Sequence, residues 1–197
     1  MSRWEPNARE RLARAALELF VERGYEATTV AEIADRAGLT KSTFFRHFAD
    51  KREVLFGGQD MLVQLFGDAI RTAPASATTA ECLAAALESS AVAFTPERHD
   101  LAPQRRAVIA ANSELQEREL LKRFRFASAM AEALRARGAD EVTARLAAEV
   151  GVLAFSTAYA RWAEPDNQAP FTEIANGALR ELQTSAAGLA GRTPSRH

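Results

Sequence analysis

Three short amphipathic helical patterns follow one another near the start of the chain, and their close spacing constrains the fold more than any other feature of the sequence. Residues 7–23 place apolar side chains at the three- to four-residue spacing of a helix, and Gly24 is a helix stop. Thr29 and Glu32 have the spacing of a capping box. That pair predicts the start of a second helix, which Gly38 ends, and a third short helix follows.

The second and third of these helices form a predicted helix-turn-helix. This motif needs two short helices joined by a tight turn, because only then can the second helix enter the major groove of DNA while the first braces it. Residues 29–48 meet that demand, since Gly38 allows the sharp turn and Thr40 can cap the third helix. Phe44 and Phe48 share one helix face and predict an apolar anchor against the first helix. The opposite face is then free for DNA.

The free face of the third helix offers short polar and basic side chains. Lys41 and Arg46 can pair with guanine edges, and Thr43 can touch a thymine methyl group. His47 and Lys51, toward the end of the helix, can hold phosphates. The residue types therefore predict both base reading and backbone contact.

The distribution of charge confines any DNA contact to this region. The whole chain carries a net charge of −1 at pH 7, which argues against a protein that binds nucleic acid over its whole surface. Residues 36–52, by contrast, hold five basic side chains and one acidic side chain. Architectural DNA binding is disfavoured by the near-neutral total.

Composition narrows the classes of fold and of site that the chain can contain. The chain is 47% hydrophobic and 26% charged, and its apolar share is rich in alanine and leucine, which favours an all-α fold. The single cysteine, Cys82, excludes an intramolecular disulfide and is interpreted as a buried small residue. His47, His99 and His197 lie on separate segments without partners at ligand spacing, so no metal and no cofactor is expected.

The cellular location is predicted from two negative features. The first twenty residues lack the uninterrupted apolar core of a signal peptide. No stretch reaches the roughly 18 consecutive apolar residues of a membrane span. The sequence therefore predicts a soluble, cytoplasmic protein with no membrane partner.

The remainder of the chain reads as a larger helical region. Asp50 and Glu53 predict the cap of a helix that continues to Ile70. Capping pairs, glycines and prolines predict five further helices. They are expected at residues 78–94, in a short segment that ends at 112, at 113–138, at 140–163 and from about 171 to 188. The expected fold is all-α with about nine helices. Its predicted domains are a helix-turn-helix domain at 1–50, a helical domain at 51–190 and a disordered tail at 191–197.

The segment AALELFVERGYEATTVAEIADRAGLTKSTFFRHFADKREVL resembles the DNA-binding segment of the tetracycline-repressor (TetR) family of bacterial regulators. The resemblance covers residues 12–55. It rests on the ordered combination of A-A-L-x-L-F, G-Y-x-x-T-T, I-A-x-x-A-G, T-F-x-x-H-F and K-x-x-x-L at fixed intervals. It implies a homodimer in which residues 51–190 form a ligand-binding and dimerisation domain.

The same resemblance implies roles for individual residues. Phosphate contacts are expected from Thr29, His47 and Lys51. Base or groove contacts are expected from a run at the start of the third helix, Thr40, Lys41, Ser42, Thr43 and Arg46. Phe45 departs from the family, in which a tyrosine commonly reaches the backbone; without the hydroxyl it can offer only apolar contact to a sugar or a thymine methyl group.

Two features of the larger domain are candidates for ligand binding and dimerisation. Helical bundles rich in large apolar residues can leave a pocket between helices. The candidate lining residues are Phe66, Phe94, Phe124, Phe155, Tyr159 and Trp162. For the dimer, a stripe of small residues lets helices approach closely, and it contains Ala144, Ala147, Ala148, Gly151, Ala154, Phe155 and Ala158.

The leading interpretation is a repressor that occupies a near-palindromic operator in double-stranded DNA and is released by a small-molecule effector. The helix from Asp50 to Ile70 is the expected transmission element, with Phe66 facing the core of the larger domain. An activator of the same fold is an alternative within this class. A helical enzyme is the alternative from another class, although no nucleophile elbow, phosphate loop or HExxH motif is present.

Overall fold

The computed structural model describes residues 7–190, and within that range the chain is helical without strands. Eleven α-helices and one 3-10 helix are found there, and nine of the α-helices are longer than a single turn. Their bounds are α1 Ala8–Arg23, α2 Val30–Arg36, α3 Lys41–His47, α4 Glu53–Phe56, α5 Gln59–Thr72, α6 Thr79–Ser89, η1 Ser90–Ala93, α7 Pro96–His99, α8 Ala102–Ala110, α9 Ser113–Ala136, α10 Glu141–Trp162 and α11 Phe171–Ala190. The predicted tail at 191–197 lies outside the described residues.

The chain forms two compact units. Unit 1 holds the described part of Met1–Gln59 with Leu101–Leu121, and unit 2 holds Asp60–Asp100 with the described part of Lys122–His197. This division differs from the predicted boundary at residue 50, because α4, α8 and the start of α9 fall in unit 1. The predicted functional division into a DNA-binding and a ligand-binding domain stays a prediction.

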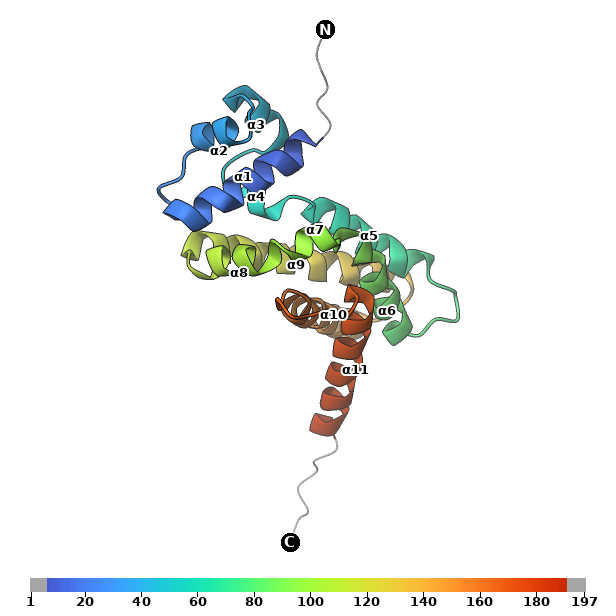
Figure 1. Ribbon diagram of the computed structural model, residues 1–197. Helices are drawn as coiled ribbons and strands as arrows, with labels where there is room; N and C mark the ends of the chain where they lie inside the picture. The colour runs from blue at the N-terminus through green and yellow to red at the C-terminus, as the bar shows by residue number, and fades with distance from the viewer. Residues whose placement is uncertain (1–6, 191–197) are drawn as a thin grey trace. The chain divides into compact units, whose positions relative to one another are not determined.

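Unit 1 is built on α1, which packs against α2, α3, α4 and α8. Leu12 and Phe20 of α1, Ile33 of α2 and Phe44 of α3 belong to one buried apolar cluster, and Figure 1 shows α1, α2 and α3 grouped together. The same cluster includes residues of α8 and α9, namely Val108, Ile109 and Leu115. This shared core explains why residues 101–121 belong to unit 1.

The predicted helix ends of the helix-turn-helix are confirmed. The Thr29 hydroxyl accepts a hydrogen bond from the Glu32 amide, and the Glu32 carboxylate accepts from the Thr29 amide, which is a complete capping box. Thr40 Oγ1 accepts from the Thr43 amide at the start of α3. Gly38 has a φ of 65°, a conformation that costs glycine little and lets the chain turn sharply between α2 and α3.

The predicted continuous helix from Asp50 to Ile70 is wrong. The chain breaks after Phe56, and Gly58 has a φ of 95° before α5 begins at Gln59. Asp50 Oδ1 does accept from the Glu53 amide at 3.0 Å, but the Glu53 carboxylate pairs with Arg118 instead of closing a capping box. The Gly57–Gly58 pair ends the first turn because glycine has the weakest helix propensity apart from proline. No single rigid helix therefore joins residue 50 to residue 70.

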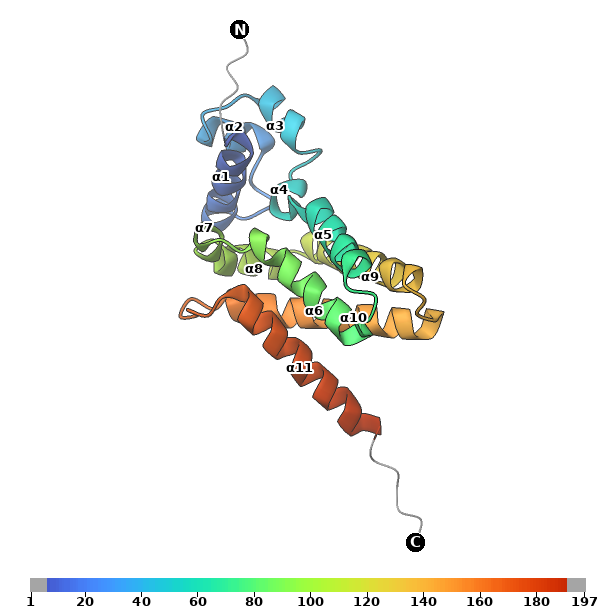
Figure 2. The same ribbon diagram turned by 90° about the vertical axis from the view of Figure 1, so that its right-hand side faces the viewer.

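Unit 2 is a helical bundle in which α10 packs against α11 and α6 (Figure 2). Phe66, Phe126 and Phe155 meet edge to face at its centre, with ring centroids 5.1 to 5.6 Å apart. A Cβ added at Gly151 would lie 2.9 Å from the Met130 sulfur, so the helices approach closely there. This position belongs to the small-residue stripe of α10.

The small-residue stripe packs inside the protomer, which corrects its predicted use as the dimer surface. Six of its members are buried within a single chain, namely Ala144, Ala148, Gly151, Ala154, Phe155 and Ala158. Ala147 is half-buried. The stripe serves contacts of α10 with other helices of unit 2, because a small side chain admits a close neighbour whichever chain supplies it.

Candidate DNA-binding interface

Helix α3 presents one face to the core and the other to solvent. Phe44 is fully buried and Phe48 nearly so, and their ring centroids lie 5.5 Å apart. The candidate contact residues lie on the other side of the helix, where Thr43 is half-buried and Thr40, Lys41, Ser42, Phe45, Arg46 and His47 are exposed. The structure thus brings together on one surface the candidates that the sequence predicted on this helix.

Hydrogen bonds order the first turn of α3. Thr40 Oγ1 and Thr43 Oγ1 lie 3.0 Å apart, and Arg46 Nη2 donates to Thr43 Oγ1 across 3.1 Å. Lys41 Nζ lies 5.9 Å from the centroid of the Phe45 ring, which is 49% exposed. Phe45 therefore offers an apolar surface beside a basic side chain, with no hydroxyl for a phosphate.

Positive charge is available at α3 and neutralised around it. Arg36 pairs with Glu22 of α1, Arg23 pairs with Glu32, and Arg52 pairs with Asp50. In the part of the chain that the structure describes, Lys41 and Arg46 form no ion pair with an acidic side chain. The side chains of Arg23, Arg36 and Arg52 are therefore paired with acidic groups, whereas Lys41 and Arg46 face solvent.

Thr29 is exposed at the start of α2, where its hydroxyl also donates to the Glu32 carboxylate at 2.8 Å. The hydrogen bonds from the Thr29 amide and hydroxyl hold the pKa of Glu32 below its ordinary value. A phosphate contact from Thr29 would therefore be made by a residue whose position is fixed by the capping box.

Lys51 has an unexpected environment. Its side chain is half-buried, and Nζ donates to the carbonyl oxygens of Tyr25 at 2.6 Å and Thr28 at 3.0 Å. Nζ also lies 4.1 Å from the centroid of the Tyr25 ring. Sequence reasoning placed Lys51 among the phosphate contacts and gave no signal of these partners, because they lie more than twenty positions away in the chain.

The aromatic candidates of unit 2 divide between its core and its surface. Phe66 and Phe155 lie in the core, whereas Phe124 is 67% exposed on α9. Phe94, Tyr159 and Trp162 adjoin one another, with ring centroids 5.0 to 6.2 Å apart.

An open cavity of about 570 Å³ lies between the α7 region and the α10–α11 connection. Phe94, Trp162, Phe171 and His99 are among the residues that line it. His99 was not among the predicted ligand residues. Its Nε2 is buried without a hydrogen-bond partner among the described residues, and its ring meets Trp162 edge to face. No sequence motif marked it.

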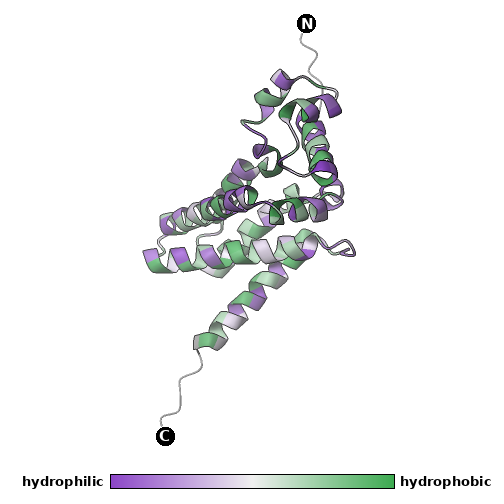
Figure 3. Ribbon diagram, turned by 90° about the vertical axis from the view of Figure 1, so that its left-hand side faces the viewer, coloured by the Kyte–Doolittle hydropathy of each residue, from purple (hydrophilic) through white to green (hydrophobic). Residues whose placement is uncertain are grey.

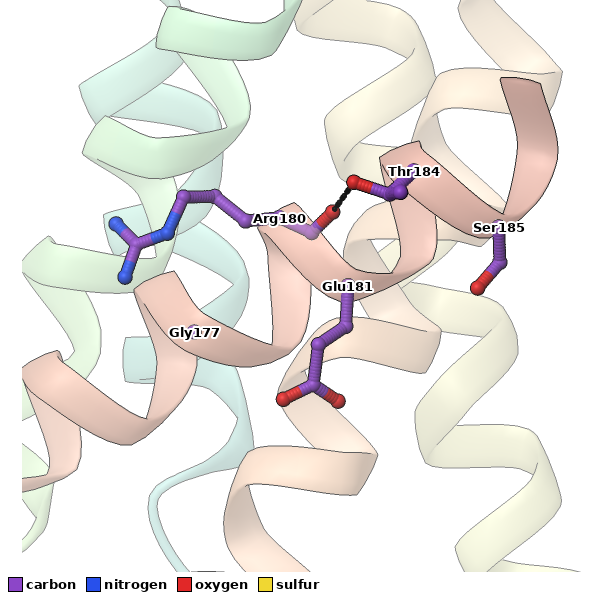
Figure 4. Close-up of a pocket in the computed structure, with 5 residues that line it drawn as sticks. All are labelled: Gly177, Arg180, Glu181, Thr184 and Ser185. Atoms are coloured by element: carbon purple, nitrogen blue, oxygen red, sulfur yellow. Dashed lines mark hydrogen bonds between the residues drawn. The ribbon is translucent and has the colours of Figure 1, made fainter. Parts of the chain in front are cut away.

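The exposed faces of α10 and α11 are the remaining candidate surface, in this case for dimerisation. Val142, Leu146 and Leu153 of α10 are 75%, 66% and 44% exposed and lie on one helix face, since they are spaced by four and seven residues. Along α11, hydrophobic and hydrophilic stretches follow one another, and the C-terminal end is mainly hydrophobic (Figure 3). The hollow drawn in Figure 4 is lined by Gly177, Arg180, Glu181, Thr184 and Ser185 of this helix.

Membrane insertion has no candidate among the described helices. None of those between residues 7 and 190 has both the length and the apolarity needed to cross a bilayer.

A tight two-helix motif on an apolar core, with an exposed basic face on its second helix, defines a helix-turn-helix DNA-binding protein. The sequence profile described as "Bacterial regulatory proteins, tetR family" matches residues 12–56. This match covers the segment that the resemblance to the TetR family predicted.

Curated relatives match mainly in the N-terminal region. The chain is 38% identical over 81 residues to the transcriptional regulator TcmR of Streptomyces glaucescens, which covers 41% of this chain and 36% of TcmR. It is 46% identical over 68 residues to the transcriptional activator FasR of Mycolicibacterium smegmatis, covering 32% of this chain and 31% of FasR. These matches thus span about a third of each relative.

Solved structures extend the similarity in fold to most of the chain. The Thermus thermophilus FadR, a repressor crystallised with lauroyl-CoA, has a TM-score of 0.55 at 26% identity, covering 96% of this chain and 98% of FadR. The Bacillus subtilis FadR, crystallised with stearoyl-CoA, has a TM-score of 0.55 at 23% identity, covering 88% and 96%. The latter supports the fold alone.

Proposed function

We propose that this protein is a cytoplasmic, sequence-specific transcriptional repressor that binds a near-palindromic DNA operator as a homodimer. The observation that carries this proposal is the exposed face of α3. There Phe44 and Phe48 are buried, and Lys41 and Arg46 form no ion pair with an acidic side chain between residues 7 and 190. A face of this kind suits direct reading of base edges in the major groove.

The proposed DNA contacts follow the predicted residues on this surface. Thr40, Lys41, Ser42, Thr43 and Arg46 would contact bases or the groove, because they occupy the start and exposed face of α3. Thr29 and His47 would contact phosphates, and Phe45 would pack against a sugar or a thymine methyl group. The ordered hydrogen bonds of Thr43 and Arg46 support the proposal, because they limit the side-chain entropy lost on binding.

The proposed homodimer uses the exposed faces of α10 and α11. Val142, Leu146 and Leu153 form an apolar stripe that a second protomer would cover. On α11, a Cβ added at Gly177 or Gly188 meets nothing within 4 Å, so this face has room for a neighbouring helix. A two-fold axis through such a surface would match the symmetry of a near-palindromic operator.

The proposed effector is a small molecule bound by unit 2. The cavity lined by Phe94, Trp162 and His99 supports such a site, and Tyr159 lies beside it. Phe66 and Phe155 would contribute from the core and Phe124 from the surface of α9. FadR of Thermus thermophilus was crystallised with lauroyl-CoA, so an acyl-CoA is the first compound to test.

The sign of regulation is the main alternative within this class. FasR is named as an activator, whereas KstR2 of Mycobacterium tuberculosis, 45% identical over 47 residues, is named as a repressor. An enzymatic role is disfavoured by the family, and we propose no catalytic residue and no cofactor.

A binding experiment tests the proposal. Fluorescence anisotropy with duplexes tiled across the DNA upstream of the protein's own gene should reveal one segment bound at least a hundredfold more tightly than a scrambled duplex of the same length. Binding that is equal on all duplexes and lost with added salt would show only sequence-blind phosphate attraction. That result would reject sequence-specific regulation from this region.

A further inference from the structure

Lys51 connects two segments that flank the helix-turn-helix. It lies between α3 and α4, and its Nζ contacts the connection between α1 and α2. The carbonyl groups that it reaches, those of Tyr25 and Thr28, precede Lys51 by 26 and 23 residues. The whole of α2, the turn and α3 lies between these contact points, so the bonds of Lys51 close the motif into a loop.

The ammonium group is well matched to this environment. An ammonium has three N–H donors and no acceptor. Carbonyl oxygens of Tyr25, Thr28 and Glu26 lie 2.6, 3.0 and 3.5 Å from Nζ, and the Tyr25 ring lies 4.1 Å away. Hydrogen bonds to a charged donor are stronger than those between neutral groups. The aromatic face adds a cation–π contribution.

The segment that Lys51 contacts is tightly packed and leads directly into α2. Tyr25 is 3% exposed and its ring meets Phe20 edge to face at 5.1 Å. Thr28 is 1% exposed, and its hydroxyl is 2.8 Å from the Gly24 carbonyl oxygen to which it donates. The next residue, Thr29, is the cap of α2. A contact at Thr28 therefore fixes where α2 starts.

We infer that Lys51 is a positioning residue of the DNA-reading unit: it fastens the α1–α2 connection to the segment after α3 and thereby sets the orientation of α2 and α3. This inference rests on the proposed DNA-binding function. It is an alternative to the predicted phosphate contact, because the ammonium is already engaged by protein carbonyls.

Lys51→Met tests the inference, because methionine keeps an unbranched apolar stem and removes the donors and the charge. The wild-type protein and the variant are compared on the duplex that the wild-type protein selects and on a scrambled duplex, across a range of salt concentrations. We expect affinity for the selected duplex to fall about tenfold or more, affinity for the scrambled duplex to change little and the salt slope to stay unchanged. Amides of residues 25–33 should exchange faster with deuterium in the free variant.

Lys41→Met is the matched control, because it removes a lysine charge from the exposed face of α3 without touching the α1–α2 connection. Its exchange at residues 25–33 should match the wild type. For Lys51→Met, an equal loss on both duplexes with a salt slope lower by about one would identify a phosphate contact and overturn the inference. Wild-type affinity for the selected duplex in a folded but less stable Lys51→Met protein would also overturn it, since Lys51 would then be merely structural.

If the Lys51→Met protein does not fold, the Lys51→Arg variant tests the inference instead. Arginine keeps the charge, so a phosphate contact predicts wild-type affinity. The planar guanidinium of arginine directs its donors apart, whereas the carbonyl oxygens converge on a single nitrogen. If Lys51 is a positioning residue, the Lys51→Arg protein should therefore bind the selected duplex more weakly and the scrambled duplex as the wild type does. Wild-type affinity for Lys51→Arg rejects the inference. If the wild-type protein selects no duplex, the proposed function fails, and exchange at residues 25–33 still tests the contact itself.

Discussion

Arg46 Nη2 donates to Thr43 Oγ1 across 3.1 Å, one turn back along α3. The same hydroxyl lies 3.0 Å from that of Thr40. A basic side chain that faces solvent is thus held by a threonine that can itself touch a base, which couples the positions of two candidate contacts.

We predict that Thr43→Ala changes which operator variants are preferred, because it removes both a possible thymine contact and the partner of Arg46. A base contact is worth about 1–3 kcal/mol, so the preference at one or two base pairs should change by about tenfold. Lys41→Ala should likewise change preference at its own base pair. Competition binding with every single-base variant of the operator measures this. Uniform loss over all variants would show that these residues do not read bases.

The dimer surface is tested by Leu146→Glu. Leu146 is 66% exposed in the protomer, so a charge there is tolerated by the single chain but would be buried in the proposed interface. We expect Leu146→Glu to be a folded monomer by light scattering at concentrations where the wild type is a dimer. Ala154→Glu is the contrasting variant, because Ala154 is fully buried within one chain and should lose stability instead. A folded, dimeric Leu146→Glu protein would place the interface elsewhere.

Phe66→Ala should lower the free energy of unfolding by about 3–5 kcal/mol, because Phe66 is fully buried between Phe126 and Phe155. Chemical denaturation measures this loss. The break at Gly57–Gly58 removes the rigid helix through which Phe66 was predicted to transmit an effector signal. We therefore expect wild-type operator affinity at temperatures where the variant stays folded. Reduced affinity there would restore Phe66 to signal transmission.

Gly58→Ala should destabilise the protein by about 1–2 kcal/mol, because a φ of 95° is strained for a residue with a Cβ. No atom lies within 4 Å of the position of that Cβ, so the loss would come from the backbone alone. Gly58→Asn should cost less, since asparagine tolerates positive φ better than alanine. Thermal unfolding of the two variants measures the difference. Equal stability of Gly58→Ala and the wild type would show that the chain can straighten here into one helix.

The capping box of α2 predicts that the stability of the fold depends on pH. The pKa of Glu32 is lowered by the Thr29 bonds in the folded protein, so its carboxylate stabilises the fold above the ordinary carboxyl pKa. That contribution should be lost as the pH falls through the lowered value. Glu32→Gln should therefore lose more stability at neutral pH than in acid. Unfolding curves at several pH values measure the gap between the two proteins, and a gap that is constant with pH would exclude Glu32 as its source.

The sequence by itself determined the local structure of the helix-turn-helix. Thr29 and Thr40 were predicted to cap helices, and each accepts a bond from an amide three residues ahead. Such interactions depend on neighbours along the chain, which is why spacing reveals them. The exposed candidates of α3 were predicted for a similar reason, since Phe44 and Phe48 fix which side of a short helix is buried.

Only the tertiary structure decided what each apolar or charged side chain meets. Helical periodicity shows that α8 and α10 have apolar faces, but it does not show that Val108 joins the core of α1 or that Ala154 packs within its own chain. The carbonyl partners of Lys51 and the exposure of Phe124 were equally beyond prediction. Such contacts join residues far apart in sequence, and hydrophobic burial is non-directional, so a pattern along the chain specifies a face and leaves its partner open.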